Sequence, residues 1–211
     1  MKTVYFVRHG QSEDNVKKVH QAPDSPLTEL GFKEAAIIAD RVSKLPVEAF
    51  IASPFLRTKQ TAECITQKIG IQPEYNALFA EGRGMTQFIG MSETSPEAVA
   101  AYKTLRSNYG PGYHFGDEEG YDEHTARANA ALDFLAKRQE EHIVVVTHGF
   151  FVRILLAHVI FNLKPTAQEI QSITWNIDTP LNTSVSLFTH DEQRAQSWRL
   201  WVWNDHAHLA E

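Results

Sequence analysis

The hydrophobic positions along the chain predict alternating strands and helices. Residues 3–7 are β-branched or aromatic throughout, which is typical of a buried central strand, and residues 47–52 and 142–147 predict two further apolar strands. Apolar residues recur at helical spacing over residues 28–45, and Pro46 ends that helix. Ser53 and Pro54 are expected to open a helix over 54–69 as its N-cap and first-turn proline. The pattern also predicts helices at 96–107, 121–138 and 150–161, strands at 183–189 and 196–203, and a polar loop at 10–27.

The order of these elements predicts an α/β fold. Strands that alternate with helices favour three layers, with a mostly parallel central sheet and helices on both faces. Residues 79–120 interrupt the alternation with seven glycines, two prolines and a single helical stretch, so we expect an irregular helical insert that acts as a lid. No repeat or linker divides the chain, and 211 residues suffice to bury about 70% of the unfolded surface. Residues 1–211 are therefore expected to form a single domain.

The amino-acid composition limits the binding partners and the cellular compartment that we expect for this protein. A formal net charge of −6 argues against nucleic-acid and anionic-membrane binding, so a positive field for an anionic substrate must be local to a pocket. The single cysteine, Cys64, excludes an internal disulfide and a Cys-based zinc cage, and it fits a reducing compartment. No apolar run reaches the length of a membrane span, and the first strand starts too early for a signal peptide. We expect a cytoplasmic protein, whose oligomeric state the sequence leaves open.

Cationic side chains follow three of the predicted strands. Arg8 and His9 end the first strand, Arg57 follows the second, and His148 ends the strand at 142–147. The carboxyl ends of parallel strands meet at the ligand-binding edge of an open sheet, so these side chains should share one crevice. Four potential cations in one crevice favour an anion such as a phosphate group.

The residue types suggest a reaction. Neighbouring Arg8 and Arg57 disfavour an imidazolium at His9, which leaves a neutral nucleophile near pH 7. Attack on phosphorus gives a phosphohistidine that water then hydrolyses, while the guanidiniums and His148 bind the phosphoryl oxygens. These fixed cations could replace the metal ions of other phosphoryl-transfer sites. The leaving oxygen still needs a proton from a nearby carboxylic acid.

Five ordered blocks of sequence carry recognisable motifs. The blocks are Val7-Arg8-His9-Gly10-Gln11-Ser12-Glu13-Asp14-Asn15, Asp24-Ser25-Pro26-Leu27-Thr28-Glu29-Leu30-Gly31, Ser53-Pro54-Phe55-Leu56-Arg57-Thr58-Lys59-Gln60-Thr61-Ala62, Val146-Thr147-His148-Gly149 and Asn182-Thr183-Ser184-Val185. Together they resemble the histidine phosphatase superfamily, the phosphoglycerate mutase-like family. The resemblance implies His9 as nucleophile, with no metal and no cofactor. It places Arg8, Arg57, His148 and Gly149 on the phosphate and adds Asn15 and Gln21 as further phosphate-binding residues.

Two positions depart from the family pattern. Gln11 stands where the family usually has glutamate after the Arg-His-Gly motif, at a position that varies. Relatives with glycine after the second histidine take the general acid from a glutamate followed four residues later by glycine. Glu81 lies in that region, but Gly84 follows it after three residues. Glu81 is the expected acid, and Glu118 and Glu119 are the reserve candidates.

The sequence therefore predicts a metal-independent phosphomonoesterase that hydrolyses small phosphorylated metabolites. The first alternative is a cofactor-dependent phosphoglycerate mutase, which needs a paired-arginine segment in the insert. The insert has Arg83, Lys103 and Arg106 but no adjacent arginine pair, which favours the phosphatase. The second alternative is a non-catalytic module that binds phosphorylated ligands. Residues 79–120 are expected to determine the substrate, which the sequence does not specify.

Overall fold

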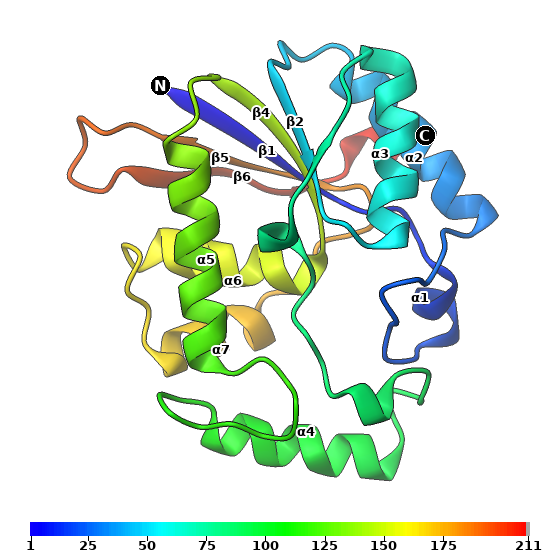
Figure 1. Ribbon diagram of the computed structural model, residues 1–211, viewed down its shortest axis with the longest axis vertical. Helices are drawn as coiled ribbons and strands as arrows, with labels where there is room; N and C mark the ends of the chain where they lie inside the picture. Colours follow the sequence, from blue (N-terminus) through cyan, green and yellow to red (C-terminus); the bar gives the residue numbers. More distant parts are fainter. Residues whose placement is uncertain (210–211) are drawn as a thin grey trace.

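Six strands form one sheet in the order β3-β2-β4-β1-β5-β6 in the computed structural model of the chain, which describes residues 1–209 (Figure 1). The first four strands in this order run parallel, whereas β5 and β6 are antiparallel to their neighbours, so the mostly parallel sheet is confirmed. The strands are β1 (Lys2–Arg8), β2 (Ala49–Ala52), β3 (Glu74–Tyr75), β4 (His142–Thr147), β5 (Val185–His190) and β6 (Trp198–Asp205).

Helices cover both faces of the sheet because the central strands are apolar on both sides. Val144 and Val146 of β4 pack with α2 (Glu29–Val42) and α3 (Leu56–Ile69). Ile143 and Val145 of the same strand pack with α5 (Tyr121–Ala136), α6 (Gly149–Ile160) and α7 (Ala167–Asn176) on the other face. Figure 1 shows the two helix groups on either side of the strands. The expected three-layer α/β architecture is confirmed.

Three local expectations need correction. The predicted loop 10–27 contains the short helix α1 (Glu13–Lys17), and Ser12 and Asn15 form a capping box at its N-terminus. Helix α7 lies in a stretch to which no element was assigned, although Thr166 and Glu169 form a second capping box there. Helix α3 begins at Leu56 with Phe55 as its N-cap, so Ser53 does not cap it.

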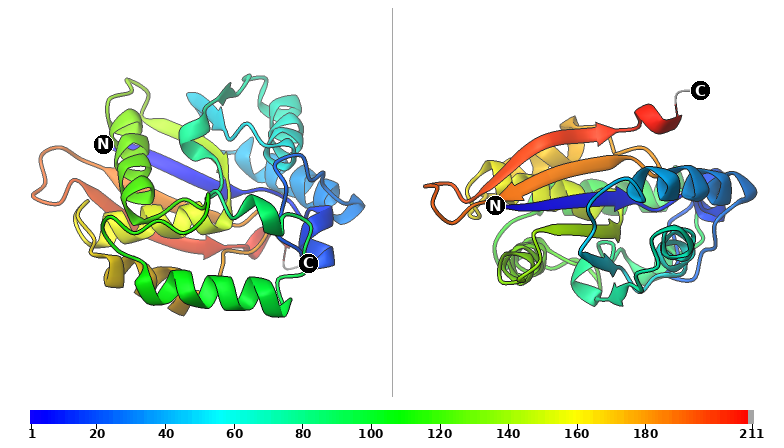
Figure 2. Two further views of the ribbon diagram at one scale, coloured as in Figure 1. Left: turned by 60° about the horizontal axis from the view of Figure 1, so that its bottom comes forward. Right: turned by 90° about the horizontal axis from the view of Figure 1, so that it is seen from above.

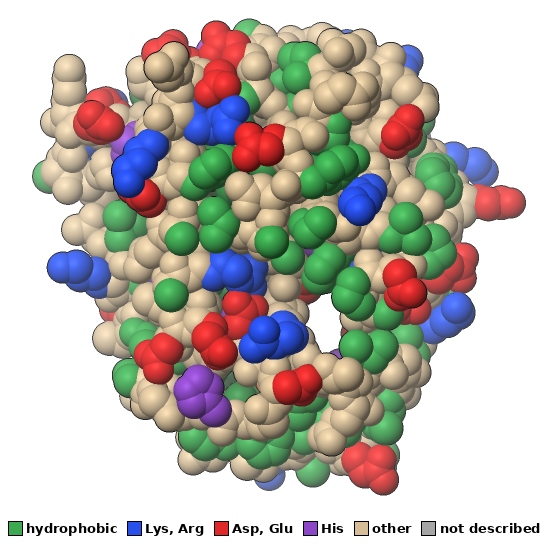
Figure 3. Space-filling view, viewed as in Figure 1, with side chains coloured by type: hydrophobic (Ala, Val, Ile, Leu, Met, Phe, Trp, Pro, Cys, Tyr) green, Lys and Arg blue, Asp and Glu red, His purple; other side chains and the backbone are tan. Residues whose placement is uncertain are grey.

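The insert, residues 79–120, packs around a small apolar cluster of its own. Met85, Phe88 and Ala98 form the centre of this cluster, and Ala98 belongs to α4 (Pro96–Asn108). Three backbone hydrogen bonds join the insert to residues 18–20, and His20 stacks on Tyr102 with ring centroids 5.1 Å apart. Helix α4 lies on the side toward which β1 and β4 point, and the left view of Figure 2 brings it to the front. The space-filling view shows an opening between α4 and the carboxyl ends of the strands (Figure 3).

Within residues 1–209, no helix combines the length and the apolar character needed to cross a membrane.

Candidate active site

His9 follows β1 and is almost fully buried, with 1% of its surface exposed. Its backbone N–H donates to the carbonyl of Thr147, which fixes it beside the end of β4. The ring atom Nδ1 lies 2.7 Å from the carbonyl oxygen of Gly10. Because a carbonyl only accepts hydrogen bonds, Nδ1 carries the proton and Nε2 is unprotonated. Nε2 accepts a hydrogen bond of 3.2 Å from Nε of Arg57, so the nucleophilic nitrogen faces a guanidinium.

The surroundings of His9 keep its ring neutral. Burial lowers the pKa of His9 well below its ordinary value, and the charges of Arg57 and then Arg8 lower it further. The expected effect of the two arginines is present, and burial adds a larger effect that the sequence did not reveal. A neutral ring with an unprotonated Nε2 is the form that can attack phosphorus.

Two guanidiniums border His9 from different elements. Arg57 comes from the first turn of α3, is 1% exposed, and donates from Nη1 to the carbonyl of Ala22. Arg8 donates from Nη1 to the carbonyl of Pro180, while its buried Nε has no partner among residues 1–209. Burial lowers the pKa of Arg57 to about 10, and the carboxylate of Glu81 is the largest effect in the opposite direction. A phosphate group would supply the negative charge that these buried cations favour.

His148 faces His9 from the end of β4, with the two ring centroids 5.3 Å apart. Its Nε2 lies 2.7 Å from the hydroxyl of Ser53, which also accepts a hydrogen bond from the N–H of Phe55. The hydroxyl proton of Ser53 can therefore point to Nε2, which leaves the proton of His148 on Nδ1. Nδ1 is buried and has no partner in the described part of the chain. This N–H can donate to a phosphoryl oxygen.

The amide side chains predicted for the phosphate loop are held through their oxygens. Oδ1 of Asn15 accepts from the backbone N–H of Ser12 at 3.1 Å, which leaves the single hydroxyl proton of Ser12 to donate to Oε1 of Gln21 at 3.2 Å. Asn182 donates to the carbonyl of His9 and approaches Oδ1 of Asn15 at 3.5 Å. Oxygens that are occupied in this way leave the amide N–H groups of both residues free to bind an anion.

Gly149 starts α6 against the side chain of Arg8. A Cβ atom at this position would lie 2.5 Å from Cγ2 of Thr179 and 3.3 Å from Nε of Arg8. The first distance is far below a normal contact, so a side chain here would displace Thr179, and the second is tight enough that the side chain of Arg8 would have to shift by a few tenths of an ångström. Gly149 therefore belongs to the site through the space that it leaves to Arg8.

The carboxylate of Glu81 lies at the N-terminus of α6. Oε1 accepts from the N–H groups of Phe151 and Gly82 at 2.9 and 3.0 Å, and Oε2 accepts from Phe150 at 3.3 Å. The positive end of the helix holds the carboxylate next to the His148-Gly149 turn. The charge of Glu81 raises the pKa of Arg8, Arg57 and Arg153, against the effect of their burial.

The reserve candidates for the acid occupy other surroundings. Glu119 is 7% exposed and binds both Nε and Nη2 of Arg127, each at 2.6 Å. Oε2 of Glu118 is buried and has no partner within residues 1–209, and burial raises the pKa of this carboxyl to about 8, assisted by the charges of Asp117 and Glu119. Glu119 is bound to Arg127 and Oε2 of Glu118 has no partner in the described chain, whereas the carboxylate of Glu81 binds the N–H groups that directly follow His148 and Gly149. This position favours Glu81 as the acid.

Two contributors to the site were not assigned a role from the sequence. Ser53 holds His148, and Asn182 holds the backbone of His9. Both lie within blocks that resemble the family, which is the signal that could have identified them. Their roles depend on contacts across 95 and 173 residues, which local patterns do not reveal.

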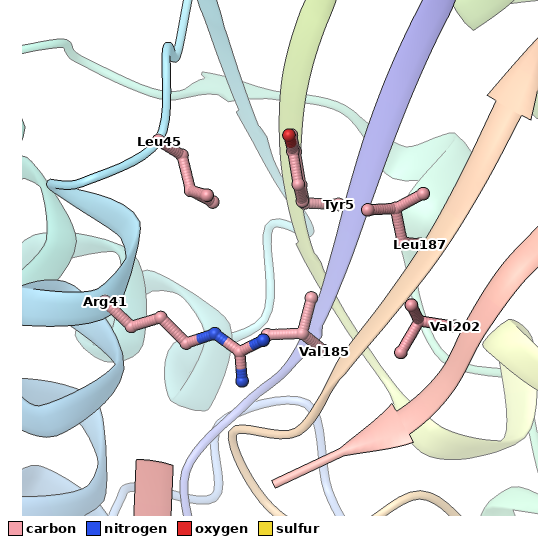
Figure 4. Close-up of a pocket in the computed structure, with 6 residues that line it drawn as sticks. All are labelled: Tyr5, Arg41, Leu45, Val185, Leu187 and Val202. Carbon is pink, nitrogen blue, oxygen red and sulfur yellow. The ribbon is translucent and has the colours of Figure 1, made fainter. Parts of the chain in front are cut away.

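No group of three or more His, Cys, Asp or Glu side chains in residues 1–209 could hold a metal ion, and the metal-free site stays a prediction. A separate pocket of about 50 Å³ lies between α2 and the strands β5 and β6 (Figure 4). Arg41 borders it, but its guanidinium is bound to Asp205. The other lining residues are Tyr5, Leu45, Val185, Leu187 and Val202, none of which belongs to the candidate active site.

Known proteins resemble this chain along its whole length. The profile of the histidine phosphatase superfamily (branch 1) matches residues 4–206. The chain is 30% identical over 213 residues to phosphoglycerate mutase-like protein 4 of Arabidopsis thaliana, an alignment that spans 99% of this chain and 87% of that protein. It is similar in structure to a mycobacterial glucosyl-3-phosphoglycerate phosphatase in complex with VO3, with a TM-score of 0.79, 22% identity, and coverage of 97% and 99% of the two chains. It is also similar to a phosphoserine phosphatase mutant from Entamoeba histolytica in complex with phosphoserine, with a TM-score of 0.79, 20% identity, and coverage of 99% and 100% of the two chains. At these identities the two structures show a shared fold.

Proposed function

Because the chain belongs to the histidine phosphatase superfamily, we propose that it is a phosphomonoesterase that hydrolyses small phosphorylated metabolites through a phosphohistidine at His9. The observation that carries the proposal is the unprotonated Nε2 of His9, which faces Arg57 in a buried pocket that also contains Arg8 and His148. The single cysteine supports a reducing compartment, the cytoplasm, as the place of action.

In the first step, Nε2 of His9 attacks phosphorus and the bond to the ester oxygen breaks. The guanidiniums of Arg8 and Arg57 and the Nδ1–H of His148 bind the phosphoryl oxygens, on which charge is spread in the transition state. Asn15 and Gln21 add their amide N–H groups. The preorganised cations supply the charge stabilisation, so the proposed reaction needs no metal ion.

Glu81 enters this first step as the carboxylic acid, gives the leaving oxygen its proton, and is left as the carboxylate. Oε2 suits this role because it accepts a single long hydrogen bond, whereas Oε1 accepts two shorter ones. In the second step the Glu81 carboxylate takes a proton from water, which attacks phosphorus and breaks the bond to Nε2. Phosphate leaves, and His9 returns to its neutral form.

The insert supports a phosphatase over a mutase. A mutase must hold a second anionic group of its substrate, but two of the three insert cations are engaged elsewhere, and the third, Lys103, lies exposed on α4. Arg83 donates to the carbonyl of Asp117 and pairs with Glu123 at 3.5 Å, and Arg106 lies over the ring of Trp175. Two of the structural neighbours, the glucosyl-3-phosphoglycerate phosphatase and the phosphoserine phosphatase, are phosphatases, which supports this proposal.

Phosphate release from a panel of phosphorylated metabolites and p-nitrophenyl phosphate tests the proposed function. We expect turnover of at least one substrate, at a rate on the order of 1 s⁻¹ or above, and none by His9→Ala. A mutase would instead interconvert phosphoglycerates in response to 2,3-bisphosphoglycerate, with little net phosphate release. A protein that binds phosphate but turns over no substrate would be the non-catalytic module.

A further inference from the structure

A buried ion pair outside the phosphate pocket holds the backbone around Glu81. Glu119 precedes α5 and Arg127 belongs to it, and their side chains are 9% and 15% exposed. Oε2 of Glu119 accepts from the N–H of Arg83 at 3.0 Å, and the Glu119 N–H donates to the Arg83 carbonyl at 2.9 Å. The chain is therefore fixed two residues after Glu81.

Arg127 fixes the same segment on the other side of Glu81. Its Nη1 donates to the carbonyl of Ala80 at 2.7 Å and to that of Leu78 at 3.3 Å. One guanidinium thus binds the Glu119 carboxylate with Nε and Nη2 and the backbone before Glu81 with Nη1. This arrangement uses the planar fork of arginine, which lysine cannot reproduce.

The ion pair also touches the helix end that receives the Glu81 carboxylate. The guanidinium of Arg127 lies 4.1 Å from the ring centroid of Phe151, whose N–H donates to Oε1 of Glu81. Between the two anchored points, Gly82 packs so closely that a Cβ atom would lie 2.8 Å from the ring of Phe150. The backbone of Glu81 and the groups that receive its carboxylate are therefore held by one set of contacts.

We infer that Arg127 and Glu119 are positioning residues that hold Glu81, the general acid of the proposed function, at the phosphate pocket. Neither side chain forms a hydrogen bond with His9, Arg8 or His148 in the described chain, so their contacts reach the site through the segment of Glu81. The positive charge of Arg127 also lowers the pKa of His148, and Arg127→Lys keeps that charge. A buried ion pair adds little net stability compared with apolar side chains of similar size, and the value of this pair lies in the geometry that it fixes.

The test compares two substrates that differ in leaving group. A general acid matters most when the leaving group is poor, so loss of Glu81 alignment should slow an alkyl phosphate more than p-nitrophenyl phosphate. The readout is the ratio of kcat/KM for the two substrates, because kcat/KM excludes the hydrolysis of the phosphoenzyme that both share. Glu81→Gln sets the ratio that complete loss of the acid produces.

Arg127→Met should lower kcat/KM for the alkyl phosphate about tenfold more than kcat/KM for p-nitrophenyl phosphate, because small displacements of a catalytic group are costly. Arg127→Lys keeps the charge without the fork and should give an intermediate ratio. The matched control is Arg138→Met, which breaks an ion pair with Glu74 and Glu140 just beyond the end of α5 and away from Glu81. The control should leave the ratio unchanged.

A double variant shows whether Arg127 acts through Glu81. When Glu81→Gln is already present, Arg127→Met should change the ratio no further. Equal slowing of both substrates by Arg127→Met would make the pair purely structural and overturn the inference. If Arg127→Met does not fold, Arg127→Lys and Glu119→Gln decide by the same ratio. If Glu81→Gln itself leaves the ratio unchanged, the assignment of the acid in the proposed function fails, which is a separate result.

Discussion

At the scale of single residues, the candidate chemistry depends on which nitrogen of each histidine carries a proton. The carbonyl of Gly10 keeps the proton of His9 on Nδ1, and the hydroxyl of Ser53 can keep that of His148 on the same atom. One histidine then presents a lone pair to phosphorus, while the other presents an N–H to a phosphoryl oxygen. Two similar side chains thus obtain opposite roles from their hydrogen-bond partners.

Ser53→Ala tests the partner of His148. Without the hydroxyl, the ring can place its proton on either nitrogen, and we expect kcat/KM to fall by about tenfold, the scale of one buried hydrogen bond. Steady-state kinetics with p-nitrophenyl phosphate measure the effect. Ser43→Ala, which removes an exposed hydroxyl far from the site, serves as the control. Unchanged kinetics of Ser53→Ala would show that His148 does not need this hydrogen bond.

Glu81→Gln tests the general acid directly. We expect hydrolysis of an alkyl phosphate to slow by about 10²-fold or more, the usual scale for acid–base groups. p-Nitrophenyl phosphate should slow much less, since nitrophenolate leaves without a proton. If neither substrate slows, the acid lies elsewhere, and Glu118 should be put through the same comparison.

At the scale of elements, a feature could be predicted from the sequence when the residues that form it lie close together along the chain. The strand ends that carry His9 and His148 could be predicted because a short apolar run leads directly into each histidine. Helix α1 was missed because its five residues contain no buried side chain and so lack an apolar stripe. The contacts of Arg127 with Leu78 and Ala80 span 49 and 47 residues, so no local pattern could show them.

Glu118 provides a test of the insert. Burial, together with Asp117 and Glu119, raises its pKa to about 8, so the folded chain keeps a proton that the unfolded chain releases near pH 4.5. This contribution to stability is complete at low pH, and it falls by up to about 1.4 kcal/mol per pH unit as pH rises toward 8. Glu118→Gln does not titrate and should gain stability relative to the wild type between pH 5 and pH 8. Urea unfolding at both pH values measures the difference, and an equal difference at each would contradict the buried carboxyl.

At the scale of the whole molecule, a chain with a net charge of −6 brings two arginines and two histidines together at the ends of its central strands. The anionic substrate of the proposed function would meet its cations at this cluster. The α/β fold, its three layers and the strand ends at the site could be predicted from the sequence. The side chains that orient the site, Ser53, Asn182 and the Glu119–Arg127 pair, became visible only in the folded chain.

Removal of metal ions tests whether these fixed cations suffice. Because guanidiniums supply the charge stabilisation in the proposed reaction, dialysis against EDTA should leave kcat and KM essentially unchanged. A metal-dependent phosphatase treated in parallel shows that the dialysis was effective. Loss of activity that zinc or magnesium restores would mean that a metal ion takes part in catalysis.

The phosphoenzyme is the most direct test of the central claim. Rapid quench of the wild type during turnover of a ³²P-labelled substrate should trap phosphate on the protein, and peptide mapping should locate it at His9. The bond should be labile in acid and stable in base, as expected for phosphorus bound to nitrogen, and His9→Ala should carry no label. Label on a serine, an aspartate or another histidine, or turnover by His9→Ala, would contradict the account.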